Sequence, residues 1–180
     1  FQVDLRICMP AGHETLNVVV PWSERRFQFT SKHQARPVDG TLTLAGETHE
    51  LGVVDAYGCL DYGRGVWPYR TEWNWASASG RQGTRVVGLQ LGGRWTDGTG
   101  TTENALVLDG RLHRIFEPLV FSYDRGDFRQ PWHIGDADRA RVDLTFTPAH
   151  VKRTRIPLLV AGTTTHQCFG HFDGQVVDDA

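Results

Sequence analysis

The period of the apolar residues most restricts what this chain can fold into. Apolar and polar residues alternate with a period of two in many short runs, as in Phe27-Gln28-Phe29-Thr30 and Thr41-Leu42-Thr43-Leu44. No window holds the i, i+3, i+4, i+7 apolar pattern over a length that would seat an amphipathic helix. Turns rich in Gly and Pro separate the runs, as at Pro37-Val38-Asp39-Gly40 and at the hairpin signal Asp109-Gly110. The Gly-rich stretch from Gly92 to Gly100 is interpreted as a hairpin loop, and a late strand is expected at Leu158-Leu159-Val160. The sequence therefore predicts an all-β fold with little or no helix.

The spacing of the runs predicts which kind of β fold this is. About ten strands are expected, at the 8–12-residue spacing typical of antiparallel sandwiches and barrels. Some strands carry polar or small residues on both faces, such as Glu72 and Asn74 on one face and Trp75 and Ser77 on the other. A ligand cavity tolerates such faces better than a close-packed core does. We expect one antiparallel β-barrel, or a strongly curved sheet, over residues 1–180.

Composition excludes several classes of partner. The 19 basic and 21 acidic residues give a net charge of −2 and are scattered along the chain, without the basic footprint of a nucleic-acid or anionic-lipid surface. No run is long and apolar enough for a spanning helix. We expect no nucleic-acid partner, and we keep open a peripheral contact with a membrane. The chain starts without Met inside a strand-like run, so we expect it to be part of a longer protein, whose remainder is also a partner.

The cysteines and histidines indicate no cofactor. Cys8, Cys59 and Cys168 form an odd set without CxxC spacing, which favours a reducing, cytoplasmic location. The histidines lack HxH and HExxH spacing, and no GxSxG sequence marks a nucleophile. We therefore expect neither a metal site nor another cofactor.

Residues 55–70 are the stretch richest in functional side chains. They are interpreted as a Gly-rich loop in which Asp61, Tyr62 and Arg64 form a polar cluster at the mouth of a cavity, with Trp67 beside it. A carboxylate there could transfer protons if burial raised its pKa. The alternative is that an Asp–Arg ion pair fastens the loop over one end of the barrel.

The segment after this loop offers two faces. Trp73 and Trp75 lie on one face of a strand and Glu72 and Asn74 on the other, so only one of the two pairs can line the interior. The tryptophans could form the floor of an apolar pocket or stabilise a developing carbocation. Ordinary aromatic core packing is the alternative.

Three further groups complete the candidate set. Glu103 and Asn104 at a strand start are either a buried acid with its amide partner or a pair that caps a strand edge, and Trp132 and His133 supply an aromatic and an acid–base side chain. Asp61 and Glu103 are the catalytic candidates. The ligand-binding candidates are Tyr62, Arg64, Trp67, Glu72, Trp73, Asn74, Trp75, Asn104, Trp132 and His133.

Several motifs in this order resemble those of the domain of unknown function 2804 family. They are Val20-Pro21-Trp22-Ser23, Leu60-Asp61-Tyr62-Gly63-Arg64-Gly65, Trp73 to Gly80, Thr102-Glu103-Asn104, Pro131-Trp132 and Phe169-Gly170. In fold this family is distantly similar to lipocalin-like two-barrel proteins, including carotenoid hydratases, tocopherol cyclases, fungal Diels–Alderase-type cyclases and a yeast survival factor that handles sphingolipids. The resemblance implies that the barrel is lipocalin-like (calycin-like) and that the chain is part of a longer two-barrel protein. It also implies a hydrophobic cavity without metal or nucleotide, and it carries over no catalytic residue.

Three functions agree with these features. The first is binding of an apolar or lipid-like small molecule by Trp73, Trp75 and Trp132. The second is a cofactor-independent hydratase, cyclase or isomerase in which Asp61 or Glu103 protonates a double bond. The third is a structural scaffold for the other half of a longer chain. Binding requires a cavity of roughly 300 Å³ or more, and catalysis requires a buried carboxylate with a raised pKa.

Overall fold

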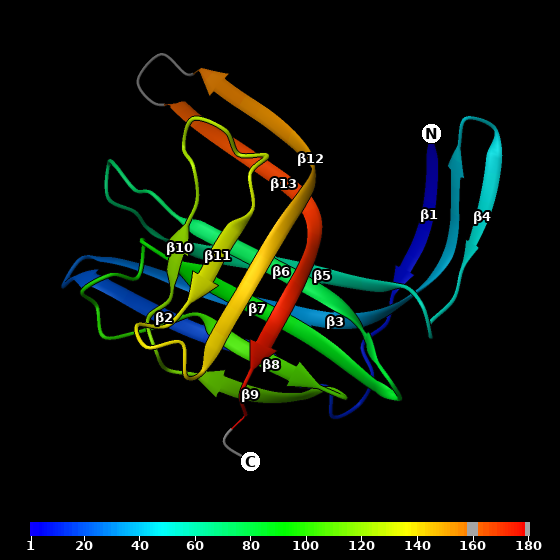
Figure 1. The fold of residues 1–180 in the computed structure, drawn as a ribbon, viewed down its shortest axis with the longest axis horizontal. Coiled ribbons are helices and arrows are strands. Elements are labelled where there is room, and N and C mark those ends of the chain that lie inside the picture. Colours follow the sequence, from blue (N-terminus) through cyan, green and yellow to red (C-terminus); the bar gives the residue numbers. More distant parts are fainter. Residues whose placement is uncertain (158–161, 179–180) are drawn as a thin grey trace. The chain divides into compact units, whose positions relative to one another are not determined.

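The structure, a computed structural model, describes residues 1–157 and 162–178 and is all-β, as predicted. Thirteen strands and no helix lie within these residues, and they form three antiparallel sheets, none closed into a barrel (Figure 1). The barrel form is therefore not confirmed. A strand predicted at Leu158-Leu159-Val160 lies outside the described residues.

The chain forms two compact units. Unit 1 comprises Phe1–Glu117 and Asp178, and unit 2 comprises Pro118–Val177. The expectation of a single domain stays a prediction.

Strand β3 (Arg26–Leu44) is the centre of the first sheet of unit 1. Its first half pairs with β2 (Leu16–Ser23) and β5 (Tyr57–Val66), and its second half with β1 (Gln2–Ile7) and β4 (Glu47–Leu51) (Figure 1). The register of the β3–β5 pair shifts between His33 and Arg36, where Ala35 has a φ of 51°. This β-bulge separates the two halves of β3.

The structure joins two strands that the sequence analysis separates. Pro37 and Gly40 were expected to form a turn between strands at 27–30 and 41–44, yet both lie inside β3. The carbonyl of Pro37 still accepts a hydrogen bond from the Cys8 N–H, at 2.8 Å. A Cβ atom at Gly40 would lie 2.1 Å from the Asp4 carbonyl oxygen, so glycine allows β1 to approach.

The second sheet of unit 1 has the order β6 (Asn74–Gln82), β7 (Arg85–Gly93), β8 (Asn104–Leu108) and β9 (Arg111–Ile115). Asp109 and Gly110 connect β8 to β9, and both have a positive φ, of 50° and 84°. This combination is typical of a type I′ hairpin turn. The hairpin predicted from Asp109-Gly110 is confirmed.

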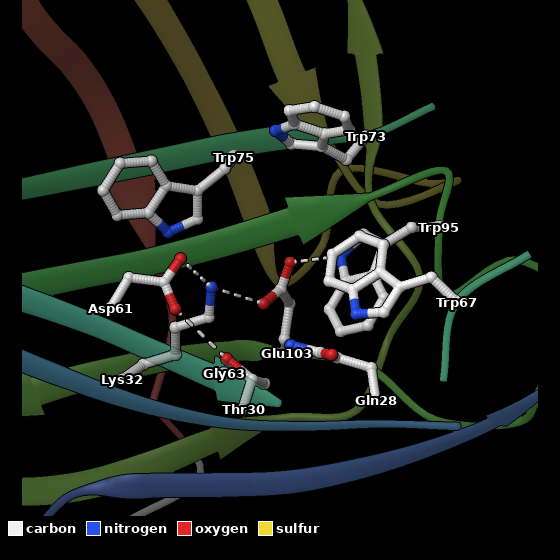
Figure 2. Close-up of a pocket in the computed structure, with 10 residues that line it drawn as sticks. All are labelled: Gln28, Thr30, Lys32, Asp61, Gly63, Trp67, Trp73, Trp75, Trp95 and Glu103. Carbon is white, nitrogen blue, oxygen red and sulfur yellow. Dashed lines mark hydrogen bonds and ion pairs between the residues drawn. The ribbon is translucent and has the colours of Figure 1, made fainter. Parts of the chain in front are cut away.

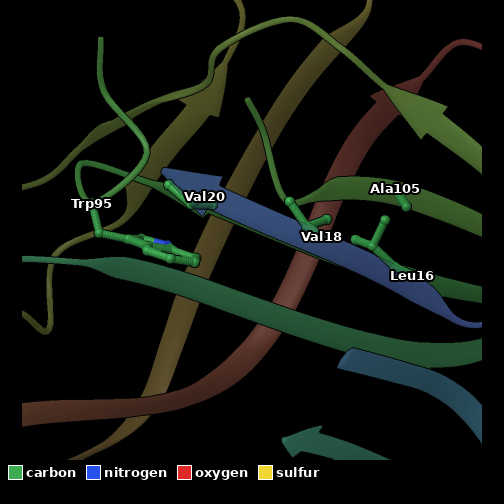
Figure 3. Packing of buried hydrophobic residues seen from close by; sticks show 5 residues of the cluster. All are labelled: Leu16, Val18, Val20, Trp95 and Ala105. Carbon is green, nitrogen blue, oxygen red and sulfur yellow. The ribbon is translucent and has the colours of Figure 1, made fainter. Parts of the chain in front are cut away.

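Alternate residues of β2 belong to one apolar core cluster of unit 1. Leu16, Val18 and Val20 are buried, whereas the intervening residues are exposed. The buried side chains pack with Trp95 and Ala105 (Figure 3). This cluster fixes Trp95, which also reaches the polar site described below.

Unit 2 is a single sheet with the order β10 (Val120–Ser122), β11 (Trp132–Gly135), β12 (Val142–Pro157) and β13 (Gly162–Val176). Strand β11 pairs with β12 only from Asp143 to Phe146. Beyond Phe146, β12 pairs with β13 alone. The two long strands therefore continue as a two-stranded ribbon.

Candidate functional site

The buried face of β3 is polar. Gln28, Thr30, Lys32 and Gln34 follow one another at every second position and are each at most 5% exposed. The neighbouring aromatic residues of the strand, Phe27 and Phe29, lie on the opposite face. A buried strand face normally carries apolar side chains, so this polar stripe indicates a site and not only a core.

A pocket of about 310 Å³ lies over this stripe within unit 1 (Figure 2). Strand β3 supplies polar residues, β5 supplies Asp61 and Gly63, and the segments around β6 and β8 supply indole rings and a carboxylate. The lining residues are Gln28, Thr30, Lys32, Asp61, Gly63, Trp67, Trp73, Trp75, Trp95 and Glu103. The volume lies at the small end of the range for ligand pockets.

The floor of the pocket is a network of charged groups. The Lys32 ammonium is 2.7 Å from Oδ2 of Asp61 and 3.0 Å from Oε2 of Glu103 (Figure 2). The side chains of Lys32 and Glu103 are 6% and 1% exposed, and that of Asp61 is 43% exposed. Thr30 Oγ1 donates to the other Asp61 oxygen, and Trp95 Nε1 donates to Oε1 of Glu103. The network thus connects the solvent-exposed carboxylate of Asp61, through Lys32, to the buried carboxyl group of Glu103.

Burial raises the pKa of Glu103 above its ordinary value of 4.5. Desolvation is the largest cause, and it outweighs the opposing effects of the Lys32 ammonium and of the hydrogen bonds from Trp95 and Lys32. Glu103 is therefore the buried carboxyl group of the pocket, and its pKa is shifted upward by that burial.

Tryptophan rings form two walls of the pocket. The rings of Trp67 and Trp95 lie nearly parallel, at 9° with centroids 6.5 Å apart, and Trp22 packs against both. Trp75 lies on the opposite side of the charged floor from this stack, and Trp73 lies above the floor (Figure 2). The Lys32 ammonium lies 5.5 Å from the centroid of the Trp75 ring, within the range of a cation–π contact.

A chain of amide groups fixes Trp75. Its indole N–H donates to Oε1 of Gln90 at 2.9 Å, and Gln34 Nε2 donates to the same oxygen at 2.8 Å. Ser77 in turn donates to Gln34 Oε1 at 2.7 Å. All four side chains belong to unit 1, and these hydrogen bonds fix the orientation of the Trp75 ring.

Two glycines make room for the polar side chains. A Cβ atom at Gly63 would lie 2.1 Å from Nε2 of Gln28, and one at Gly92 would lie 2.1 Å from Oε1 of Glu103. Each glycine therefore accommodates a buried polar group that a side chain would displace.

The structure brings together five of the residues selected from the sequence, which are Asp61, Trp67, Trp73, Trp75 and Glu103. It also decides which face of the tryptophan segment lines the interior. Trp73 and Trp75 face the pocket, whereas Glu72 and Asn74 contact Arg94, at 3.0 and 2.9 Å.

The other residues selected from the sequence lie elsewhere. Trp132 stacks on Tyr123, and His133 pairs with Asp143 at 2.7 Å, both within unit 2. Asn104 is fully buried and accepts from the Gly92 N–H at 2.7 Å. Asn104 thus holds the backbone beside Glu103 and does not line the pocket.

The interpretation of residues 55–70 as a loop is wrong for most of the segment. Residues 57–66 are strand β5, which pairs with β3. Asp61 and Gly63 line the pocket, so Tyr62 and Arg64 point from the other face of the strand. The proposed Asp–Arg ion pair is replaced by the pair between Asp61 and Lys32. The glycines at alternate positions, such as Gly63 and Gly65, led to the interpretation as a loop. In the structure they allow β5 to pack closely against β3.

Sequence reasoning missed Lys32, Gln28, Thr30 and Trp95. The sequence shows that polar and apolar residues alternate in β3. Because apolar residues are normally buried, this alternation predicts that Phe27 and Phe29 face the interior, whereas the structure buries the polar residues instead. Trp95 sits in a Gly-rich connection that was interpreted only as a hairpin loop. The two glycines at Gly63 and Gly65, opposite a polar strand, were the available signal.

No set of three or more His, Cys, Asp or Glu side chains within residues 1–157 and 162–178 is arranged to hold a metal ion. The same residues contain no helix long and apolar enough to cross a membrane. The cysteines that the structure describes, Cys8, Cys59 and Cys168, are free thiols.

Comparison with known proteins gives one match. The model of a family described as "Domain of unknown function (DUF2804)" covers residues 1–180. Neither the curated proteins nor the solved structures contain a significant match.

Proposed function

The chain belongs to the DUF2804 family, whose description states no activity, and we propose from the pocket of unit 1 that it binds a small unsaturated, lipid-like molecule. The observation that carries the proposal is the combination of four indole rings with a buried Lys32–Glu103 pair in one pocket of about 310 Å³. The rings offer flat apolar surface, and the charged floor offers partners for one polar end.

The pocket favours a ligand with two distinct ends. Trp67, Trp73 and Trp75 are 47%, 44% and 38% exposed, so apolar surface at the rim is left without a protein partner. A bound hydrocarbon body would cover these rings and remove that surface from water. A hydroxyl or carbonyl group at the inner end would exchange hydrogen bonds with Lys32 or Asp61. The proposed ligand is therefore amphipathic, with a short unsaturated chain.

Native mass spectrometry with geraniol, an unsaturated isoprenoid alcohol, tests the binding function. We expect a 1:1 complex with the wild-type chain. Trp73→Ala should weaken it because that ring is a rim wall with little core packing, whereas Phe116→Ala, which removes a 73% exposed ring outside the pocket, should not. A second probe is β-ionone, an unsaturated isoprenoid ketone. If the wild type binds neither geraniol nor β-ionone, the proposal is contradicted.

Glu103 supports a second candidate, an isomerase that uses this carboxyl group as a general acid. Its burial, at 1% exposure, and the rise in pKa that this burial causes support this role. Asp61 is exposed and paired with Lys32, so it lacks the desolvation that this role needs. This second proposal includes a lipocalin-like form of the fold, distantly similar to that of carotenoid hydratases.

The proposed reaction shifts a double bond. The Glu103 O–H bond breaks and the π electrons form a new C–H bond, which leaves a carbocation on the neighbouring carbon and a carboxylate at Glu103. The indole faces stabilise the cation, and Lys32 and Trp95 stabilise the carboxylate. The carboxylate then removes a proton from the carbon beside the cation, which forms the shifted double bond and restores the acid.

Incubation of geraniol with the protein in D₂O separates the two candidates. A catalyst of this kind places deuterium on carbon, and Glu103→Gln should abolish the incorporation while geraniol still binds. If the wild type binds geraniol but incorporates no deuterium, the binding function stands and the isomerase proposal is contradicted.

A further inference from the structure

We propose that Lys32 forms an imine with the carbonyl group of an unsaturated, lipid-like aldehyde or ketone held in the pocket of unit 1. The inference rests on the proposed function, because it names the chemical class of the ligand and the atom to which the ligand is joined. The carbonyl carbon is bonded to Nζ of Lys32 at the floor, and the hydrocarbon body contacts the tryptophan rings.

The choice of lysine at this position carries the first step. Lys32 and Lys152 are the two lysines among 19 basic residues, and all the others are arginines. Lys152 is exposed on β12, whereas the Lys32 side chain is 6% exposed and lines the pocket. Arginine suits a buried ion pair at least as well, but its guanidinium stays protonated and forms no imine. Lys32 therefore supplies a primary amine as well as a charge.

Glu103 lies where it can take a proton from this amine. Its Oε2 is 3.0 Å from Nζ of Lys32 and, within the described residues, accepts no hydrogen bond from any other group. Burial raises the pKa of Glu103, which lowers the cost of moving a proton from the ammonium to this carboxylate. The transfer leaves an amine beside a carboxylic acid, and these are the nucleophile and the proton donor that imine formation needs.

The proposed reaction consumes no oxidant or reductant. The Nζ lone pair of the free amine attacks the carbonyl carbon, the π electrons move to the oxygen, and the oxygen takes the proton from Glu103. The Glu103 carboxylate then removes a proton from the nitrogen. The nitrogen lone pair forms the C=N bond while the C–O bond breaks, and the departing hydroxide takes the proton from Glu103 and leaves as water. The products are a protonated imine, water and the Glu103 carboxylate.

The pocket stabilises this product because the nitrogen is positive before and after the reaction. Oδ2 of Asp61 lies 2.7 Å from Nζ of Lys32, and the centroid of the Trp75 ring lies 5.5 Å from it. Figure 2 shows the ammonium between the carboxylates of Asp61 and Glu103. The protonated imine retains one N–H group that donates to a carboxylate, and the ring continues to face a cation.

Reductive trapping with geranial, the aldehyde that corresponds to geraniol, tests the inference. The full chain is incubated with an equimolar amount of geranial and with sodium cyanoborohydride, which transfers hydride to the carbon of a protonated imine and leaves a stable secondary amine. We expect one adduct in the intact mass, located on Lys32 by peptide mapping. Lys152 is the internal control and should stay unmodified, because it lies outside the pocket.

Two further measurements link the adduct to the pocket. An excess of geraniol should block the labelling, since the alcohol occupies the same pocket and forms no imine. Lys32→Arg should lose the adduct although it keeps a cation beside Glu103, and Lys152→Arg is the matched control that should be labelled as the wild type is. The peptide map of the wild type decides the site even if Lys32→Arg does not fold.

The outcomes separate this inference from the function on which it rests. If geraniol binds but no adduct forms on Lys32, the inference is overturned and the binding function stands. Equal labelling of Lys32 and Lys152 also overturns it, because the reaction then reflects the general reactivity of amines. If neither geraniol nor β-ionone binds and no adduct forms, both proposals are contradicted.

Discussion

The Lys32 ammonium lies 3.0 Å from Oε2 of Glu103, and the two side chains are 6% and 1% exposed. The pair comes from β3 and from the residue just before β8, so it links the two sheets of unit 1. A buried charge that loses its partner is costly, because water does not replace the lost interaction. The stability of unit 1 should therefore depend on the pair and on pH.

Lys32→Met is expected to destabilise the fold by about 3–5 kcal/mol at pH 8, the cost of leaving a buried charge unpaired. The loss should be smaller at pH 5. Burial raises the pKa of Glu103, so its contribution to stability is fully present below pH 4.5 and decreases as pH rises through the folded-state pKa. Without Lys32 that pKa rises further, and the decrease with pH becomes larger.

Urea unfolding at pH 5 and pH 8 measures this effect. Lys152→Met, which removes an exposed ammonium of unit 2, is the matched control and should change stability little. A second substitution, Glu103→Leu, should restore much of the stability lost in Lys32→Met, because the unpaired charge is then absent. An equal loss at both pH values would show that the charge of Glu103 does not determine the effect.

Gly92→Ala is expected to disturb the same carboxylate. The added methyl group would lie 2.1 Å from Oε1 of Glu103, which is held by Lys32 and Trp95. We expect a destabilisation of about 1–3 kcal/mol, as for overpacked interiors. Gly80→Ala is the control in the adjacent strand β6, since its methyl group would meet nothing within 4 Å. Thermal unfolding that ranks Gly80→Ala as the more harmful change would contradict the position of Glu103.

The histidines beside Arg36 predict acid sensitivity. Desolvation first, and then the Arg36 charge, lowers the pKa of both His13 and His33. The unfolded chain then binds more protons than the folded chain below about pH 6.5, so their contribution is fully present above pH 6.5 and is lost as pH falls through the folded-state pKa values.

The variant His13→Gln, His33→Gln should therefore lose less stability than the wild type between pH 7.5 and pH 5.5. His49→Gln, at an exposed position on β4, is the matched control and should follow the wild type. If all three proteins have the same pH dependence in urea unfolding, His13 and His33 do not titrate as their surroundings require.

Local pattern predicts the secondary structure well and the site only in part. The period of two and the Asp109-Gly110 turn were sufficient for the strands and one hairpin. The pattern could not show that β3 turns Lys32 inward, because that orientation depends on Asp61 and Glu103, which are distant in the sequence. It could not show that β5 is a strand either, since its glycines are explained only by the neighbouring β3 side chains.

The tryptophans of the site were predicted more readily than its polar residues. Trp73 and Trp75 share a face by alternation alone, and the pocket confirms that these two side chains lie together. Trp95, in the turn after β7, joins them through the core cluster around β2, which belongs to the other sheet. Contacts of this kind are set by sheet packing, which a single sequence does not display.

The most direct test of the central claim uses the indole N–H signals in a ¹⁵N–¹H correlation spectrum. The chain has 6 tryptophans, and substitution of each assigns its signal. On titration with geraniol, the signals of Trp67, Trp73, Trp75 and Trp95 should shift together with one saturable dissociation constant, while Trp132 of unit 2 stays in place. Unchanged pocket signals at saturating geraniol, or a shift confined to Trp132, would contradict ligand binding in the pocket of unit 1.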